Sequence, residues 1–317
     1  MIRSLLLAIM IALSLVAGDI APYAKIEAKG IVKDISLHGD KLYIATDAGL
    51  VQIYDIVEKK FLREIALPKI KDFMGDAIAP KVFSVDAIDG KVLLLSDSGK
   101  GGYANLWMDE NNQTKKLLDE KSKKALIKAR FIDKNHILFG YLGNEAGLYD
   151  IKKQKELYRV QISPSKFSDF ALNEDKSQAV YACESGILTV IDTKTGKTVK
   201  RLEGINLDNV YKVDFKHGFV SGAGQDRRGS IYDVKTGKGD FFKGNFLIYA
   251  TGLSPSANKV AFAMDEDNDI TIFNTATKSK IARLKGQKST LNNIIFLDEE
   301  RLVSSSDDTV IMMWKLN

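Results

Sequence analysis

The chain ends in the stretch Arg301–Asn317, which reads RLVSSSDDTVIMMWKLN. The apolar run Val310–Trp314 follows an acidic turn and predicts a β-strand, because its residues are apolar or favour strands. Similar stretches upstream are each followed by a turn and a further strand, whereas here only three residues follow Trp314. The fold therefore depends on which other segment lies beside this last strand.

Seven such stretches run through the chain, and each ends in a large apolar residue. The end residues are separated by 53, 42, 42, 41, 41 and 41 positions, and an Asp follows directly in four of the seven. In chain order they are Tyr54, Trp107, Tyr149, Ile191, Tyr232, Phe273 and Trp314. A period near 40 with an aromatic–Asp ending is typical of WD40-type β-propeller blades, which have four strands each.

The seventh repeat contains only three strands, and this predicts how the ring closes. The segment Tyr23–Gly30, YAKIEAKG, is similar to the fourth strands of other repeats, such as KRLEG and ARLKG. We predict that it pairs beside Val310–Trp314, because an unpaired sheet edge is prone to aggregation. The alternative is that this segment is a loose terminus. The expected fold is an all-β, WD40-like, seven-bladed β-propeller, whose last blade is completed by an N-terminal strand.

The first residues have the layout of a secretory signal peptide. Arg3 precedes the apolar run Ser4–Ala17, and small residues follow. The run is short for a membrane span, which needs about 20 apolar residues. We therefore expect residues 1–18 to be a signal peptide, with an uncleaved anchor as the alternative, and residues 19–317 to be the propeller. The single Cys183 allows no intramolecular disulfide, and an exported protein without disulfides fits a bacterial periplasm best.

The charge pattern does not indicate a nucleic-acid-binding protein. The net charge is +5, and Lys and Arg are spread among Asp and Glu with no dense basic block. No membrane span is expected after signal cleavage, and we expect a monomer.

The sequence gives little indication of a catalytic or metal-binding site. His38, His136 and His217 are expected in turns of alternate blades, where they cannot converge on one ion. The run Asp265–Asp269 resembles the start of a calcium loop but lacks its Gly and final Glu, so a solvated turn is favoured. Gly99–Gly102, GKGG, has no helix start behind it and predicts a turn between strands. We therefore expect no enzymatic activity, no bound metal and no cofactor.

A protein-binding surface is the remaining candidate. The segments Pro68–Lys81 and Ser96–Asn105 lengthen repeat two on the face that carries the links between blades. Mixed charge with Tyr and Arg is typical of binding surfaces. The candidate partner-binding residues at the channel mouth and on this face are Asp34, Lys128, Asp169, Tyr211, Lys212, Arg227, Arg228, Tyr249 and Asn293.

A signal peptide, seven degenerate WD40-like repeats, few His and one Cys together resemble the NapL family. These are periplasmic accessory proteins encoded with the periplasmic nitrate reductase of epsilonproteobacteria. Repeat endings such as GLVQIYDI and DDTVIMMWKL carry the propeller part of the resemblance. The resemblance implies a non-catalytic role in assembly, maturation or electron supply of that system. It carries over no functional residues.

Two alternatives stay open. One is a scaffold for outer-membrane protein assembly, which predicts an apolar groove or an exposed strand edge. The other is a metal- or quinone-dependent propeller enzyme, which would need convergent ligands near the axis, where Asp34 and Asp169 are the only acids of the aligned ring.

Overall fold

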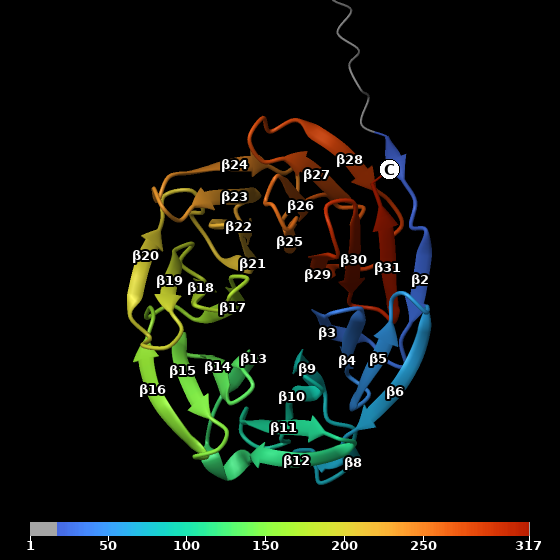
Figure 1. Ribbon diagram of the computed structural model, residues 1–317, viewed down its shortest axis with the longest axis vertical. Coiled ribbons are helices and arrows are strands. Elements are labelled where there is room, and N and C mark those ends of the chain that lie inside the picture. Colours follow the sequence, from blue (N-terminus) through green and yellow to red (C-terminus); the bar gives the residue numbers. More distant parts are fainter. Residues whose placement is uncertain (1–17, 317) are drawn as a thin grey trace, which may run out of the picture.

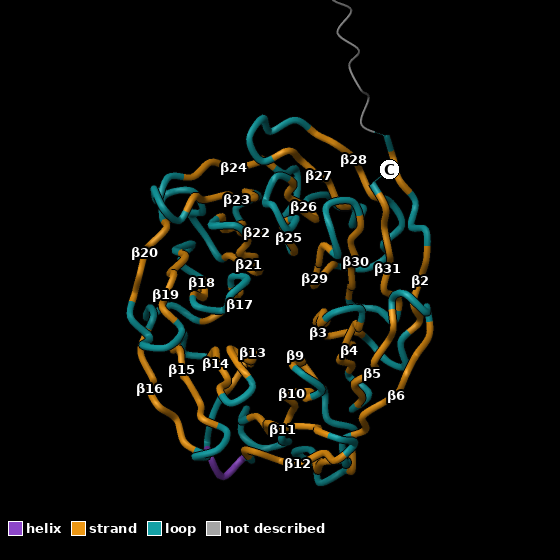
Figure 2. The backbone as a smooth tube through the Cα atoms, viewed as in Figure 1, coloured by secondary structure: helices purple, strands orange, loops and turns teal. Residues whose placement is uncertain are grey.

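The computed structural model describes residues 18–316, which form a ring of seven β-sheets around a central axis (Figure 1). The expected signal peptide, apart from Gly18, lies outside the described residues. Strands and short loops make up almost all of the ring, and a single 3₁₀ turn, η1 (Glu120–Ser122), lies between two blades (Figure 2). The described part of the chain has no helix long and apolar enough to cross a membrane.

Each blade is a four-stranded antiparallel sheet whose first strand lies nearest the axis. Blade 1 consists of β3 (Val32–His38), β4 (Lys41–Thr46), β5 (Leu50–Asp55) and β6 (Lys60–Ala66). Blade 2 consists of β9 (Val82–Ile88), β10 (Lys91–Asp97), β11 (Ala104–Glu110) and β12 (Gln113–Leu118). Blade 3 consists of β13 (Leu126–Asp133), β14 (His136–Tyr141), β15 (Glu145–Asp150) and β16 (Lys155–Gln161).

The remaining blades repeat this order. Blade 4 consists of β17 (Phe167–Leu172), β18 (Gln178–Cys183), β19 (Leu188–Asp192) and β20 (Thr198–Leu202). Blade 5 consists of β21 (Val210–Lys216), β22 (Phe219–Gly224), β23 (Arg228–Asp233) and β24 (Gly239–Lys243). Blade 6 consists of β25 (Ala250–Leu253), β26 (Lys259–Ala263), β27 (Ile270–Asn274) and β28 (Lys280–Leu284). Blade 7 contains β29 (Leu291–Phe296), β30 (Arg301–Ser306) and β31 (Val310–Lys315).

The fourth strand of blade 7 comes from the other end of the propeller, which confirms the predicted closure. Strand β2 (Ala24–Glu27) pairs antiparallel with β31, and Ile26 lies opposite Ile311. Strand β1 (Asp19–Ile20) adds in parallel to β28 at the edge of blade 6. The N-terminal segment therefore joins two neighbouring blades on the outside of the ring (Figure 1).

The Asp that follows the third-strand aromatic residue has a local structural role. The carboxylates of Asp55, Asp192 and Asp233 each accept hydrogen bonds from backbone N–H groups two or three residues further on. In blade 6 the side chain of Asn274 does the same. These side chains hold the turn between the third and fourth strands, which explains why Asp recurs at this position.

The core lies between the sheets, where alternate residues of each strand are buried. Trp107 and Trp314 occupy equivalent places in blades 2 and 7, and each indole N–H donates to a buried Ser of the second strand, at 3.1 and 2.9 Å. This shared contact explains how a bulky, partly polar residue is tolerated in the core of a degenerate repeat.

Ring closure gives the first testable prediction. Ile26 is 2% exposed and packs against the core of blades 1 and 7. We expect Ile26→Ala to lower the free energy of unfolding by about 2 to 5 kcal/mol, because it leaves a cavity at the closing strand. Lys25→Ala, one position away and exposed, should change it by less than about 0.5 kcal/mol. Urea denaturation measures both, and equal effects would contradict a closing role for β2.

Candidate functional site

The upper face of the ring is the face that carries the loops between second and third strands and the links between blades. On it, the link between blades 1 and 2 forms a separate hairpin of β7 (Ile70–Lys71) and β8 (Ala77–Ile78). The expected elongation of repeat two, residues 68–81, is thus an ordered hairpin. The 96–105 elongation forms the turn between β10 and β11 on the same face.

The two elongations of blade 2 touch each other. Gly99 has a φ of 73°, and a Cβ atom placed on it would lie 2.1 Å from the carbonyl oxygen of Lys71. Only glycine permits this approach of the hairpin backbone. The glycine-rich stretch therefore serves backbone packing, in agreement with the expected turn between strands.

A groove of about 610 Å³ lies between these elements. Its lining is mainly apolar or glycine and includes Ile70, Phe73, Ile78, Phe83 and Ile127. The hairpin turn is held by the Asp72 carboxylate, which accepts a 2.8 Å hydrogen bond from the backbone N–H of Asp76. At the tip of this ordered turn, Phe73 is 98% exposed and Met74 is 80% exposed. A large aromatic side chain is thus displayed beside an apolar groove.

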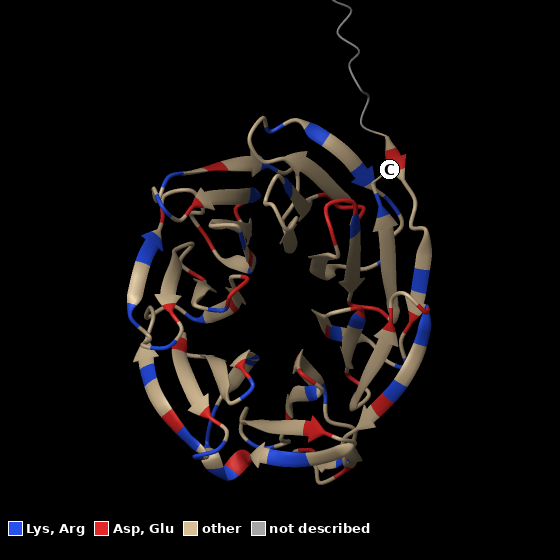
Figure 3. Cartoon of the chain, in the orientation of Figure 1, with Lys and Arg blue, Asp and Glu red and all other residues tan. Residues whose placement is uncertain are grey.

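The channel wall is the second candidate site, and it holds most of the predicted partner-binding residues. Asp34 and Asp169 are buried, while Lys128, Lys212 and Asn293 line a cavity of about 340 Å³ along the axis. The carboxylate of Asp34 accepts a hydrogen bond from the guanidinium of Arg130 at 2.8 Å and one from the backbone N–H of Val85 at 2.9 Å. Figure 3 shows acidic and basic segments side by side on the inner strands.

Lys128 and Asp169 form a buried ion pair in the channel wall, and the pKa values of both side chains are shifted. The two side chains meet at 2.6 Å and are 14% and 3% exposed. Burial lowers the pKa of Lys128 to about 8; Asp169 opposes this shift, and Arg130 and Lys212 add to it. Burial alone would raise the pKa of Asp169, but Lys128, Lys212 and two hydrogen bonds outweigh it and leave the pKa below its usual range.

Four acids of the channel wall, three of them buried, share one structural function, which is to join neighbouring blades. Each carboxylate accepts a hydrogen bond from a backbone N–H of the first strand in the next blade. The pairs are Asp34 with Val85, Asp86 with Phe131, Asp169 with Val213, and Asp214 with Leu253. Between blades 7 and 1 the direction is reversed, and the Asn292 amide donates to the carbonyl of Val32. The acids near the axis thus stabilise the ring.

The other predicted residues lie on the upper face around blades 5 and 6. Tyr211 and Tyr249 stack with ring centroids 5.2 Å apart, and Phe246 packs against Tyr249. Arg227 is exposed at a turn. Arg228 is half-buried, donates to the carbonyl of Ile205 at 2.7 Å and lies over the ring of Phe241. The structure therefore brings the two tyrosines together but gives Arg228 a packing role.

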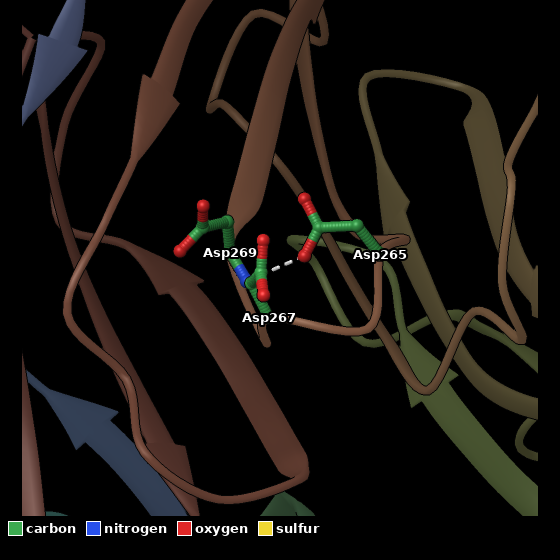
Figure 4. Close-up of side chains that lie close together, drawn as sticks. All are labelled: Asp265, Asp267 and Asp269. Atoms are coloured by element: carbon green, nitrogen blue, oxygen red, sulfur yellow. Dashed lines mark hydrogen bonds between the residues drawn. The ribbon is translucent and has the colours of Figure 1, made fainter.

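The acidic turn Asp265–Asp269 joins β26 to β27, and three of its carboxylates gather on this turn (Figure 4). The guanidinium of Arg283 lies 3.0 Å from Asp265, 3.4 Å from Asp267 and 2.8 Å from Asp269. Burial and the neighbouring Asp265 raise the pKa of Asp269 above its usual value, although Arg283 opposes them. One guanidinium thus offsets part of the negative charge of the three carboxylates.

The three histidines occupy the places predicted for them, at the turns between first and second strands of blades 1, 3 and 5. His136 contacts Asp133 at 2.9 Å and lies 3.8 Å from Asp150. Among the described residues, the one group of clustered possible metal ligands is the acidic turn above, and it contains no histidine.

Several residues of the two candidate sites were not predicted from the sequence. Arg130 and Asp214 line the channel two positions after Lys128 and Lys212, and Asp86 lines it from the first strand of blade 2. Since alternate residues of a strand face the same side, this spacing was the available signal. Phe73 and Met74 lie inside the elongation of repeat two, but no pattern in it distinguishes an exposed tip from a buried contact.

Comparison with protein family models finds no match to this chain, and no curated protein matches it. The fold therefore defines the class on its own, a WD40-like seven-bladed β-propeller.

The buried ion pair of the channel gives the second prediction. We expect Lys128→Met to lower the free energy of unfolding by roughly 3 kcal/mol, because Asp169 loses its ion-pair partner and keeps only the more distant Lys212 and Arg130. The double variant Lys128→Met/Asp169→Asn should be more stable than the sum of the single changes predicts. A double-mutant cycle by urea denaturation measures this coupling. Additive effects would show that the two side chains do not act as a pair.

The third prediction concerns pH. A lysine whose folded pKa is about 8, against an ordinary 10.5, loses its proton earlier in the folded state. Between these values the unfolded chain binds more protons, so the contribution of Lys128 to stability rises with pH, by up to about 1.4 kcal/mol per unit. We expect the wild type to gain stability relative to Lys128→Met from pH 8 to 10.5. A constant difference across this range would contradict the lowered pKa.

Proposed function

We propose that this protein is a non-catalytic periplasmic scaffold that holds a protein partner on the upper face of blade 2. The observation that carries the proposal is the hairpin tip, where Phe73 and Met74 are 98% and 80% exposed beside an apolar groove. Exposed large apolar side chains next to a groove mark interaction sites, and aromatic anchors dominate binding energy.

The rigidity of the surroundings supports this role. The hairpin is fixed by the turn at Asp72 and by its contact with Gly99, and blade 2 is joined to blades 1 and 3 by hydrogen bonds of Asp34 and Asp86. A preordered surface loses less conformational entropy when it binds.

We propose more specifically that the protein serves the periplasmic nitrate reductase system, in its assembly, maturation or electron supply. It is supported by the apparent signal peptide and the degenerate repeats that resemble the NapL family. The partner is then a component of that reductase. We further propose that the mature protein is monomeric.

A scaffold for outer-membrane protein assembly is the second candidate, and one observation favours it. Neither β7 nor β8 pairs with a further strand of the described chain, so the hairpin offers strand edges beside the apolar groove. An extended partner segment could add to such an edge by backbone hydrogen bonds.

A non-catalytic role is supported by the hydrogen bonds of the two predicted acids near the axis. The carboxylates of Asp34 and Asp169 each accept hydrogen bonds from a cationic side chain and from a backbone N–H group, and these bonds hold the ring together.

The fourth prediction tests the docking surface. Tagged protein is recovered from the periplasm of cells respiring nitrate, and the co-purified proteins are identified by mass spectrometry. We expect the double variant Phe73→Ser/Met74→Ser to recover at least tenfold less nitrate reductase than the wild type, because it removes the apolar anchor. The control is Val57→Ser, which removes another exposed apolar side chain from a turn on the opposite face.

Equal recovery by the wild type and the double variant would contradict docking at this hairpin. Recovery of outer-membrane assembly proteins that depends on Phe73 and Met74 would support the second candidate in place of the first. Absence of any enriched protein with the wild type would contradict both.

A further inference from the structure

The end of the second strand is an equivalent position in six of the blades. The residue there donates its backbone N–H to the carbonyl of the residue directly before the first strand of the same blade. In chain order these residues are Asp47, Asp97, Leu142, Glu184, Gln225 and Asp307. Because the backbone hydrogen bond is shared, the side chains at the six places can be compared directly.

The polar side chains at this position have a partner, with one exception. The pairs are Asp47 with the backbone N–H of Ile31 at 2.8 Å, Glu184 with Lys166 at 3.7 Å, Gln225 with Tyr211 at 2.7 Å, and Asp307 with Lys33 at 3.1 Å. The hydrogen bonds of Asp97 are made by its backbone. Among the residues that the structure describes, its carboxylate has no hydrogen bond and no basic side chain within 4 Å.

This unpaired acid lies in the apolar groove of blade 2. Asp97 is half-buried and lines the groove. The lining has one further acid, Asp72, which holds the hairpin turn, and one basic residue, Lys100, which is exposed. Two carboxylates thus stand against one ammonium. A segment that fills the groove removes water from Asp97, and a desolvated carboxylate is stable only when it is paired.

The aromatic lining of the groove favours one kind of cation. Phe73, Phe83 and Tyr103 all line it. A guanidinium group stacks on aromatic faces and pairs with a carboxylate through two parallel hydrogen bonds, whereas an ammonium is a compact and strongly hydrated charge. An arginine side chain therefore matches a groove that combines aromatic rings with an unpaired carboxylate.

We propose that the groove binds a partner segment in which an arginine lies between apolar residues. The guanidinium pairs with Asp97, and the apolar side chains lie against Ile70 and Ile78 of the hairpin. This inference rests on the proposed docking function and specifies the chemistry that the partner presents to the groove.

Calorimetric titration tests the proposal with two peptides blocked at both ends, leucine–arginine–leucine and leucine–citrulline–leucine. Citrulline has the shape of arginine without its charge. We expect the wild type to bind the arginine peptide about fivefold more tightly, because a partly buried ion pair is intermediate in strength between exposed and buried pairs. Asp97→Asn should remove this preference. The control Asp76→Asn, which neutralises an exposed acid outside the groove lining, should retain it.

The periplasmic pull-down separates this inference from the docking function. Asp97→Asn should recover about fivefold less partner than the wild type, and Asp76→Asn should match the wild type. Loss of the partner with Phe73→Ser/Met74→Ser but not with Asp97→Asn would overturn the arginine assignment and leave hairpin docking intact. Equal affinity of the wild type for both peptides, or saturable binding of neither, would also overturn it. A preference for the arginine peptide together with equal recovery by all variants would support the arginine site and contradict the docking function.

Discussion

The whole architecture depends on the pairing of β2 with β31. Seven sheets can surround an axis only if the last blade meets the first, and the chain achieves this by completing blade 7 with its N-terminal segment. Without this pairing, β31 would expose an apolar edge with unpaired backbone groups. The parallel addition of β1 to β28 extends the same segment onto blade 6, so the closure spans two blades.

Closure of the ring also gives the charged side chains of the channel a structural role. First strands packed around an axis leave backbone N–H groups at the blade borders, and buried N–H groups need acceptors. Asp34, Asp86, Asp169 and Asp214 supply them, and Arg130 and Lys128 balance two of these carboxylates. Most of the charge near the axis is thereby committed to structure. Lys212 adds a further positive charge that acts on Asp169.

The sequence was informative wherever a repeat was involved. The third-strand positions, the closing segment and the turn positions of His38, His136 and His217 could all be predicted, because a period near 40 fixes the register of each blade. Long-range partners could not be predicted. Asp34 and Arg130 are 96 residues apart, and nothing local distinguishes a carboxylate in a channel network from one on an interaction surface. The exposure of Phe73 likewise follows from a hairpin that lies outside the repeat pattern.

The central functional claim is that the blade 2 hairpin contacts a periplasmic partner, and site-specific photo-crosslinking in living cells tests it most directly. A photoreactive amino acid is introduced at position 73 and, in a separate strain, at position 57 on the opposite face. The account predicts crosslinks to a nitrate reductase component from position 73 and none from position 57. Crosslinks of equal yield from both positions, or none from position 73 in cells respiring nitrate, would contradict it.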